Sequence, residues 1–123
     1  MTALAEASLS GKERQALARL VPELRNRFGA RLRAVWLYGS RARGEEPHPE
    51  SDIDLLIVVD HSFATDDSRV IDVVTDVADT VGVNPVALST LVYDVDRIAQ
   101  RRAIRSFFIQ EVDRDKIVLY GEP

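Results

Sequence analysis

The segment Asp52–Val59 constrains the fold more than any other part of the chain, because two aspartates at its start lead directly into an unbroken apolar run, Leu55–Val59. Such a density of apolar residues is typical of a strand that is covered on both faces of its sheet. The segment therefore predicts a strand close to the centre of a sheet. A strand in that position requires neighbouring strands beside it and helices over the sheet.

A helix is predicted near the start of the chain. Ser10 followed three residues later by Glu13 indicates a capping box, and Gly29 suits the position just after a helix end. The residues expected on the apolar face of this helix are Leu17, Leu20, Val21, Leu24 and Phe28. Pro22 lies inside this pattern and predicts either a kink or the start of a second helix.

The remaining elements are predicted from apolar periodicity and turn residues. In chain order they are a strand at 32–38, a loop at 43–50, a helix begun by Thr65 or Asp66 and ended by Gly82, a strand at 83–88, a helix capped by Asp94 and a short strand at 116–120. Phe107 and Phe108 extend the pattern of the last helix, so both are predicted to be core residues. The order predicts an α+β fold (two-layer α/β), a small mixed sheet flanked by helices. We expect one domain over residues 1–123, with residues 1–8 as a loose N-terminus.

Composition excludes several classes of function. The chain has no cysteine, which excludes disulfides, thiolate zinc sites and cysteine nucleophiles. Its net charge is −4, from 16 basic and 20 acidic residues, and this balance does not indicate general nucleic-acid binding. We find no apolar stretch approaching the roughly 20 residues needed to cross a membrane and no signal peptide. A cytoplasmic protein without a membrane partner is therefore predicted.

Asp52 and Asp54 are candidate metal ligands. Residues two apart in a strand point to the same face of the sheet, so the two carboxylates should project together. Two carboxylates that share a partly buried place repel each other, and a divalent cation would neutralise them. Ligands that are all oxygen favour Mg²⁺ or Mn²⁺ over zinc.

Gly39 and Ser40, directly after the first predicted strand, are candidates for binding phosphate. Glycine lets the backbone approach a ligand closely, and a helical turn begun by Ser40 would present N–H groups and a hydroxyl to a phosphate. Arg41 and Arg43 add positive charge that suits phosphate oxygens. Consecutive strands usually pair, so the phosphate-binding turn at Gly39 and Ser40 should lie beside the two aspartates. A phosphate-binding turn next to a pair of metal-binding carboxylates is used in phosphoryl and nucleotidyl transfer.

Each of these residues also has a simpler explanation. A lone Gly-Ser is usually a turn, and an Asp-x-Asp is often the solvated start of a strand. Arg41 and Arg43 could be solvated or could pair with Glu45 and Glu46. A second group of arginines shares one face of the last helix, either as a solvated face or as a docking surface for an acidic partner or RNA: Arg97, Arg101 and Arg105.

The segments Gly39–Gly44 and Ser51–Asp54 together resemble the nucleotidyltransferase superfamily related to DNA polymerase beta, whose signature is Gly-Ser, a spacer of about ten residues and Asp-x-Asp. More narrowly, the chain is similar to the minimal nucleotidyltransferases of bacteria and archaea. The resemblance implies metal binding and catalysis by Asp52 and Asp54. It implies nucleotide binding by Gly39 and Ser40, with Ser40 also catalytic, and we add Arg41 and Arg43 as candidates to bind the nucleotide.

The resemblance also implies a reaction and a partner. Many minimal nucleotidyltransferases are antitoxins paired with a HEPN-domain ribonuclease toxin, and some transfer adenylyl groups from ATP to a tyrosine of that toxin. We therefore expect Mg²⁺-dependent or Mn²⁺-dependent transfer of a nucleotidyl group, adenylyl in particular, from ATP or another NTP to an acceptor hydroxyl. A homo-oligomer remains possible. Transfer to a small molecule such as an aminoglycoside is a weaker expectation, because the chain has little room for a second domain.

One departure from the family pattern keeps an alternative open. Active members usually supply a third carboxylate from a later strand, and the strand predicted at 83–88 contains no acid. Asn84 is a weaker oxygen ligand, and Asp94 or Asp96 could substitute for the missing acid. The alternative function is therefore an antitoxin with weakened catalysis, which neutralises a HEPN-type ribonuclease by contact.

Overall fold

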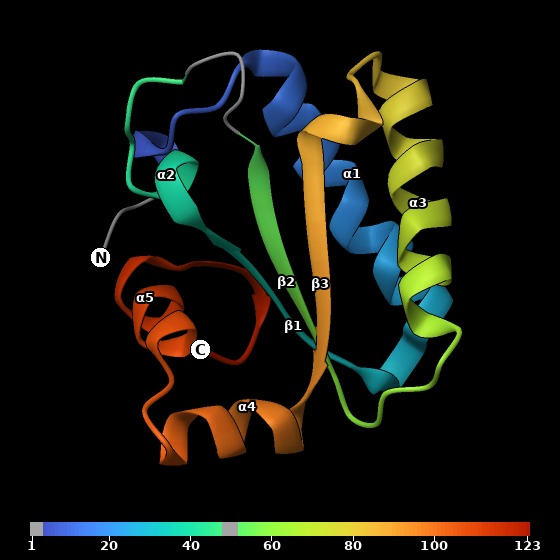
Figure 1. Ribbon diagram of the computed structural model, residues 1–123. Helices are drawn as coiled ribbons and strands as arrows, with labels where there is room; N and C mark the ends of the chain where they lie inside the picture. Colours follow the sequence, from blue (N-terminus) through green and yellow to red (C-terminus); the bar gives the residue numbers. More distant parts are fainter. Residues whose placement is uncertain (1–3, 48–51) are drawn as a thin grey trace.

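The computed structural model describes residues 4–47 and 52–123, and its centre is a four-stranded sheet (Figure 1). The strands are β1 (Leu32–Tyr38), β2 (Ile53–Val59), β3 (Leu88–Asp94) and β4 (Ile117–Gly121). Their order in the sheet is β3-β2-β1-β4. β1 pairs antiparallel with both β2 and β4, whereas β2 and β3 are parallel. The predictions of a mixed sheet and of a central second strand are confirmed.

Helices lie on both faces of this sheet (Figure 1). The α-helices are α1 (Gly11–Phe28), α2 (Gly39–Ala42), α3 (Asp66–Val81), α4 (Val95–Ala103) and α5 (Phe107–Asp115). Short 3₁₀ turns are η1 (Leu4–Glu6), η2 (Gly29–Arg31) and η3 (Pro85–Ala87). α1 and α3 cover one face, and α4 and α5 cover part of the other. The α+β prediction is confirmed, and α4 and α5 add a partial third layer to the two layers expected.

The alternation of side chains along β1 and β2 divides the core into two clusters. The larger cluster, under α1 and α3, includes Val35, Leu37, Leu55 and Ile57. The smaller cluster, under α4 and α5, includes Trp36, Leu56 and Val58. Side chains two apart in a strand share a face, so Asp54 lies on the face of Leu56 and Val58. The carboxylate therefore projects toward the side of the sheet that α4 and α5 cover only in part.

The first long helix follows its sequence signals closely. The Ser10 hydroxyl accepts the Glu13 N–H at 3.1 Å, and the Glu13 carboxylate accepts the Ser10 N–H at 2.7 Å, so the predicted capping box is present. Gly29 caps the other end. Pro22 lies inside α1 and does not divide it. The prediction of a loose N-terminus covers residues 1–8, of which residues 1–3 lie outside the described residues. Residues 4–8 contact this helix, because the Arg14 guanidinium donates to the backbone carbonyls of Leu4 and Ala7.

The prediction of a strand at 83–88 is wrong, because the strand lies further along the chain, at Leu88–Asp94. Asn84 instead caps the 3₁₀ turn η3, where its side chain accepts the Val86 N–H at 3.0 Å. Pro85 follows at the start of that turn, because proline has no N–H to give to a strand ladder. The true third strand begins at Leu88, and its Ser89 lies directly beside Asp54.

The predicted last helix is two helices. Arg105 has a positive φ of 52°, and the Ser106 hydroxyl accepts the Ile109 N–H at 3.2 Å, so α5 starts with a cap of its own. The turn directs Phe107 into solvent, where it is 79% exposed, so the prediction that it belongs to the core is wrong. Phe108 is half-buried and packs against the smaller cluster.

Two further findings concern the rest of the chain. Within residues 4–47 and 52–123, no helix combines the length and the apolar character needed to cross a bilayer. The loop predicted at 43–50 is observed over residues 43–47, and its remainder lies outside the described residues.

Candidate functional site

The end of β1 and the start of β2 bring Gly39 against Asp54. The antiparallel register places Tyr38 opposite Asp54, so the chain turns into α2 directly beside that carboxylate. Gly39 has a φ of 79°, and a Cβ atom at this position would overlap Asp54 Oδ2. Only glycine can adopt this backbone conformation without strain and leave room for the carboxylate. The prediction that the Gly39-Ser40 bend and the two aspartates are neighbours is confirmed for Asp54.

The surroundings of Asp54 disfavour the ionised form of its carboxyl group. Its side chain is half-buried, and this desolvation raises the pKa of its carboxyl group; the negative charge of Asp52 raises it further, and Arg43 opposes both effects. Asp52 itself is exposed and precedes the strand. The two carboxylates therefore repel each other at the start of β2, as the sequence predicted. A cation bound between them would relieve this repulsion.

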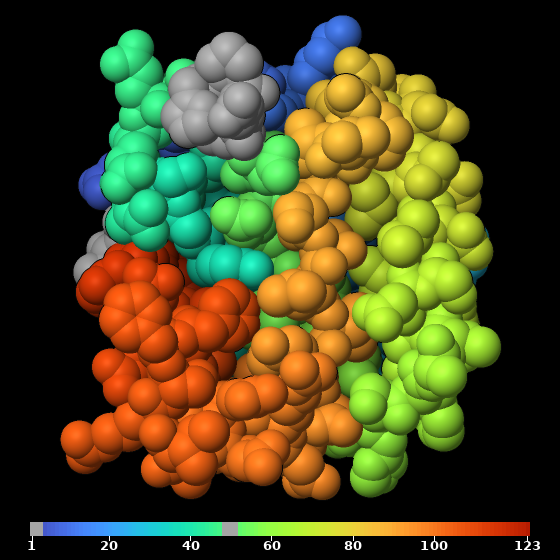
Figure 2. Space-filling model, viewed as in Figure 1, coloured from blue at the N-terminus to red at the C-terminus, as the bar shows by residue number. Residues whose placement is uncertain are grey.

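A pocket of about 360 Å³ opens in front of Asp54. Gly39, Ser40 and Asp54 line one side, and Phe108, Glu111 and Asp115 of α5 line the other. Figure 2 looks onto this side of the molecule, where atoms of α2 and β2 are visible between α5 and β3. The pocket is thus bounded by the strand ends and by α5, and it is large enough for part of a nucleotide.

Aromatic rings form the inner wall of the pocket. The Tyr38 and Phe108 rings meet edge to face, with centroids 5.5 Å apart and planes at 87°. Burial, together with the charge of Asp54, raises the pKa of Tyr38 to about 12. Tyr38 therefore presents a neutral phenol to the pocket at physiological pH. Tyr38, at the end of β1, thus lines the pocket together with Phe108 of α5.

Arg43 links the bend to α5. Its Nε donates to Glu45 Oε1 at 2.9 Å, and its Nη1 donates to Asp115 Oδ2 at 3.0 Å. The pairing with Glu45 is one of the simpler explanations considered from the sequence. Arg114 and Arg43 together hold the pKa of Asp115 below its usual range. Arg43 therefore lies at the pocket with two carboxylate partners.

Arg41 has a different environment from Arg43. It is buried, and its Nη1 donates to the Ser8 carbonyl at 2.8 Å and to Glu13 Oε1 at 3.0 Å. These partners belong to the N-terminal segment and to the first turn of α1. The Nη1 atom of Arg41 is thus directed toward α1, and Gly39, Ser40, Arg43 and Asp54 are the predicted residues that line the pocket.

None of the candidates for a third carboxylate lies beside Asp54. Asp94 is opposite Val59, five residues along the strand from Asp54, which corresponds to roughly 17 Å. Its carboxylate accepts the Arg97 N–H at 2.8 Å and caps α4, in whose first turn Asp96 lies. Within the described ranges, no three acidic, histidine or cysteine side chains are grouped closely enough to hold a metal. A cation here would depend on Asp52, Asp54 and oxygen atoms from a substrate.

The sequence did not predict that α5 lines the pocket. Glu111 and Asp115 are four residues apart, a spacing that places them on one helical face, but nothing in the sequence indicated what that face covers. Asp115 is bound by two arginines. Glu111, by contrast, has no side-chain hydrogen bond or ion pair within the part of the chain that the structure describes. It is therefore a carboxylate available to a ligand.

Comparison with known proteins gives a family match. The family model described as "Polymerase beta, Nucleotidyltransferase" matches residues 21–122, which include both strands and the bend of the site. No curated protein matches the chain in sequence.

Three solved structures contain chains of similar fold. A toxin–antitoxin complex with AMP-PNP has a chain 19% identical to this one, with a TM-score of 0.53 over 86% of this chain and 73% of that one. A mutant of the MntA–HpeT toxin–antitoxin pair has a chain 16% identical to this one, with a TM-score of 0.53. The match covers 86% of this chain and 73% of that one. A tri-AMPylated HEPN toxin of Shewanella oneidensis in complex with an MNT antitoxin gives 14% identity and a TM-score of 0.50 over 89% and 72%. At these identities the likeness shows the fold.

Proposed function

Because the chain belongs to the polymerase beta nucleotidyltransferase family, we propose that it transfers a nucleotidyl group, adenylyl in particular, from an NTP to an acceptor hydroxyl. The observation that carries this proposal is the contact of Gly39 with the Asp54 carboxylate at the edge of an open pocket. It places a backbone that can approach phosphate beside a carboxylate that forms no ion pair within the described part of the chain, although the charge of Arg43 acts on it from a distance. A reaction that consumes an NTP also fits the cytoplasmic location predicted from the sequence.

The residues present fit a magnesium or manganese ion. Mg²⁺ is usually bound in enzymes by one or two carboxylates together with substrate phosphates and water. Asp52 and Asp54 supply two carboxylates, and burial together with the charge of Asp52 raises the pKa of Asp54. In our proposal these two side chains hold the ion, and when bound it would neutralise charge on the phosphates. Because a third protein carboxylate is missing from the described residues, we expect the ion to bind strongly only together with the nucleotide.

The bend supports the phosphates in this proposal. Gly39 and Ser40 would contact the β- and γ-phosphates through backbone N–H groups and the Ser40 hydroxyl, and Arg43 lies at the same pocket. In the reaction, the acceptor oxygen forms a bond to the α-phosphorus while the bond from that phosphorus to the β-phosphate oxygen breaks, and pyrophosphate leaves. The acceptor must also lose a proton. Glu111 is the carboxylate we propose to receive it, because it lines the pocket and its side chain forms no hydrogen bond or ion pair among the described residues.

The acceptor proposed is a HEPN-domain toxin, with this chain as its antitoxin. The support is the likeness in fold to chains of toxin–antitoxin complexes, one crystallised with AMP-PNP and one with a tri-AMPylated HEPN toxin. The mutant MntA–HpeT structure changes two aspartates that are two residues apart to glutamate. That spacing is also the spacing of Asp52 and Asp54 in this chain.

The test is transfer of label from ATP labelled at the α-phosphate. The purified chain is incubated with Mg²⁺ and with a HEPN-domain protein co-expressed with it, and labelled protein is measured. We expect label on the partner with the wild-type chain and at least about a hundredfold less with the Asp52→Asn, Asp54→Asn double variant. Asp79→Asn, a change at an exposed position of α3, serves as the control. Full labelling by the double variant would refute the roles of the two aspartates.

A second function, neutralisation of the toxin by contact, is favoured by one observation. The residue beside Asp54 on β3 is Ser89, which cannot replace a carboxylate as a base. If the double variant still neutralises the toxin, contact is sufficient. If the complex forms but toxicity persists, nucleotidyl transfer is required.

A further inference from the structure

Residues Leu4–Leu9, here called the N-terminal strap, lie against α2 and the turn that follows it. The Ser8 N–H donates to the Arg41 carbonyl at 2.9 Å, and Arg41 Nη1 donates back to the Ser8 carbonyl at 2.8 Å. The Glu6 carbonyl also lies so close to Gly44 that a Cβ at Gly44 would approach it to 2.8 Å. The strap and the Gly39–Gly44 segment are therefore in direct backbone contact.

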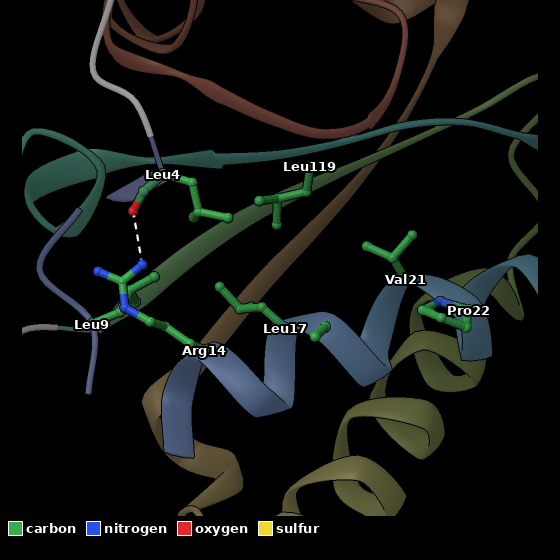
Figure 3. Close-up of a pocket in the computed structure, with 8 residues that line it drawn as sticks. Leu4, Leu9, Arg14, Leu17, Val21, Pro22 and Leu119 are labelled. Carbon is green, nitrogen blue, oxygen red and sulfur yellow. Dashed lines mark hydrogen bonds between the residues drawn. The ribbon is translucent and has the colours of Figure 1, made fainter. Parts of the chain in front are cut away.

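Arg14 of α1 holds the strap in place. Its Nη1 donates to the Leu4 carbonyl at 2.9 Å and its Nη2 donates to the Ala7 carbonyl at 2.9 Å, with a longer contact to Ala5 at 3.4 Å. Figure 3 shows this guanidinium reaching from the helix to Leu4. One side chain thus binds three carbonyls of a short segment, which fixes the path of its backbone.

Packing beneath the strap is incomplete near Leu4, so the hydrogen bonds contribute most there. A cavity of about 400 Å³ lies between the strap, α1 and β4, and its apolar lining includes Leu4, Leu9, Leu17 and Leu119 (Figure 3). Leu4 remains 41% exposed, whereas Ala7 is buried in the larger core cluster and Leu9 packs against that cluster. Dispersion contacts therefore hold the end of the strap that is nearer to α1, and they contribute less at Leu4. The hydrogen bonds from Arg14 and Arg41 add to this packing and fix the path of the backbone.

A partly buried ion pair connects the first turn of α1 to Arg41 of α2. Glu13 Oε1 accepts both the Ser10 N–H and Arg41 Nη1, at 2.7 Å and 3.0 Å. Burial works against the charge of Glu13, but its hydrogen bonds with Arg41 and Ser10 outweigh it and lower the pKa of the carboxyl. The Arg41 carbonyl, which accepts from Ser8, also accepts the Gly44 N–H at 3.2 Å. The start of α1, the strap and the turn after the bend therefore share one hydrogen-bond network.

We infer that Arg14 and Arg41 are positioning residues for the nucleotide, which hold the Gly39–Ser40 bend through the N-terminal strap in the shape that receives the phosphates. This inference rests on the proposed nucleotide binding. It gives Arg41 a role behind the bend in place of the direct phosphate contact expected from the sequence. Among the described residues, the hydrogen bonds of Arg14 go to carbonyls of the strap, and Arg14 does not line the pocket beside Asp54, so its effect must travel through the strap.

The test replaces Arg14 by methionine, which keeps the length and apolar stem of the side chain and removes the donors. Arg19→Met, at an exposed position of the same helix, is the matched control, and Arg14→Lys restores part of the donor capacity. Two measurements are made on the full chain: hydrogen exchange of the Arg43, Gly44 and Glu45 amides without ligand, and binding of AMP-PNP with Mn²⁺ compared with binding of adenosine.

For Arg14→Met we expect faster exchange at those amides and AMP-PNP binding weakened about fivefold, with adenosine binding unchanged. Arg14→Lys should recover part of the AMP-PNP affinity, and Arg19→Met should match the wild type. Equal losses for AMP-PNP and adenosine, or no difference from Arg19→Met, would overturn the inference while leaving nucleotide binding intact. Failure of the wild type to bind AMP-PNP would instead overturn the proposed function and this inference with it.

Discussion

At the scale of single residues, Asp54 is placed at a cost to stability. Burial and the charge of Asp52 raise its pKa in the folded chain. A group whose pKa is raised by folding favours the folded state below the pKa of the unfolded chain, and this contribution is lost as the pH rises through the folded pKa. At neutral pH, therefore, the ionised Asp54 destabilises the fold. A carboxylate kept under these conditions is typical of a ligand-binding site.

We expect Asp54→Asn to be more stable than the wild type at pH 7 in the absence of metal. The gain should lie within the range of about 0.5–2 kcal/mol that is common for stabilising single substitutions. The difference should shrink below pH 4, where the wild-type carboxyl is itself protonated. Urea unfolding of both proteins in EDTA, at pH 7 and below pH 4, measures this difference in stability. A variant that is less stable at pH 7 would contradict the charge assigned to Asp54.

Gly39 is the residue at which the bend depends on the absence of a side chain. Gly39→Ala requires a left-handed backbone at an alanine and pushes against Asp54, so we expect a loss of about 1–3 kcal/mol in the free energy of unfolding. Mn²⁺–AMP-PNP binding should be lost as well. Gly11→Ala is the control, because a Cβ at Gly11 meets nothing within 4 Å. Chemical denaturation and calorimetric titration of both variants test the comparison.

At the scale of elements, one buried carboxylate fixes the start of α3 to the turn η2, which directly precedes β1. Asp66 is 1% exposed, and its Oδ2 accepts from Arg31 Nη2 at 2.7 Å and from the Phe63 N–H at 2.9 Å. Burial opposes its ionisation, but Arg31 and the Phe63 N–H outweigh burial and lower the pKa. This contribution to stability is present above the pKa of the unfolded chain and is lost as the pH falls through the folded pKa.

Asp66→Ala should therefore cost about 1–3 kcal/mol at pH 7, because it leaves the Arg31 and Phe63 donors without this acceptor. The loss of stability should diminish at acidic pH, where Asp66 is protonated in the wild type. The sign of the effect is opposite to that of Asp54→Asn, which we expect to gain stability at pH 7. Asp67→Ala, an exposed neighbour in the same helical turn, should change stability little. Thermal unfolding of the Asp66→Ala and Asp67→Ala variants between pH 3 and pH 7 measures the two effects. An unchanged penalty across this range would exclude an ionised Asp66 as the cause.

At the scale of the whole molecule, the pocket joins elements that are distant in sequence, and binding there should stabilise all of them together. A ligand that binds only the folded state stabilises it by about 2.7 kcal/mol at a hundred times its dissociation constant. Because Asp52 and Asp54 have no third carboxylate beside them in the described ranges, we expect Mn²⁺ alone to raise the melting temperature little. Mn²⁺ with AMP-PNP should raise it by about 4–8 °C or more at saturation.

Differential scanning fluorimetry of the wild type and of the Asp52→Asn, Asp54→Asn variant tests this dependence. The variant should lose the joint effect of metal and nucleotide. A full shift with Mn²⁺ alone would contradict a site that requires substrate oxygen atoms. An equal shift in the variant would place the metal elsewhere.

The sequence by itself determined the elements whose signals are local. The capping box of Ser10 and Glu13, the apolar alternation of the first two strands and the Gly39-Ser40 and Asp52–Asp54 motifs depend on residues a few positions apart. Periodicity and capping act over that range, so they could be interpreted without knowledge of the fold. The pairing of the first two strands followed because consecutive strands are usually neighbours.

Only the tertiary structure decided how distant segments meet. The third strand begins at Leu88 because β2 offers it a parallel edge, whereas the local apolar pattern favoured the residues before it. Arg41 turns toward Ser8 and Glu13 because α1 packs behind the bend, and Glu111 reaches the pocket because α5 folds back over the sheet. These contacts join residues separated by tens of positions. Their energies depend on packing and charge across the whole chain, which no local pattern encodes.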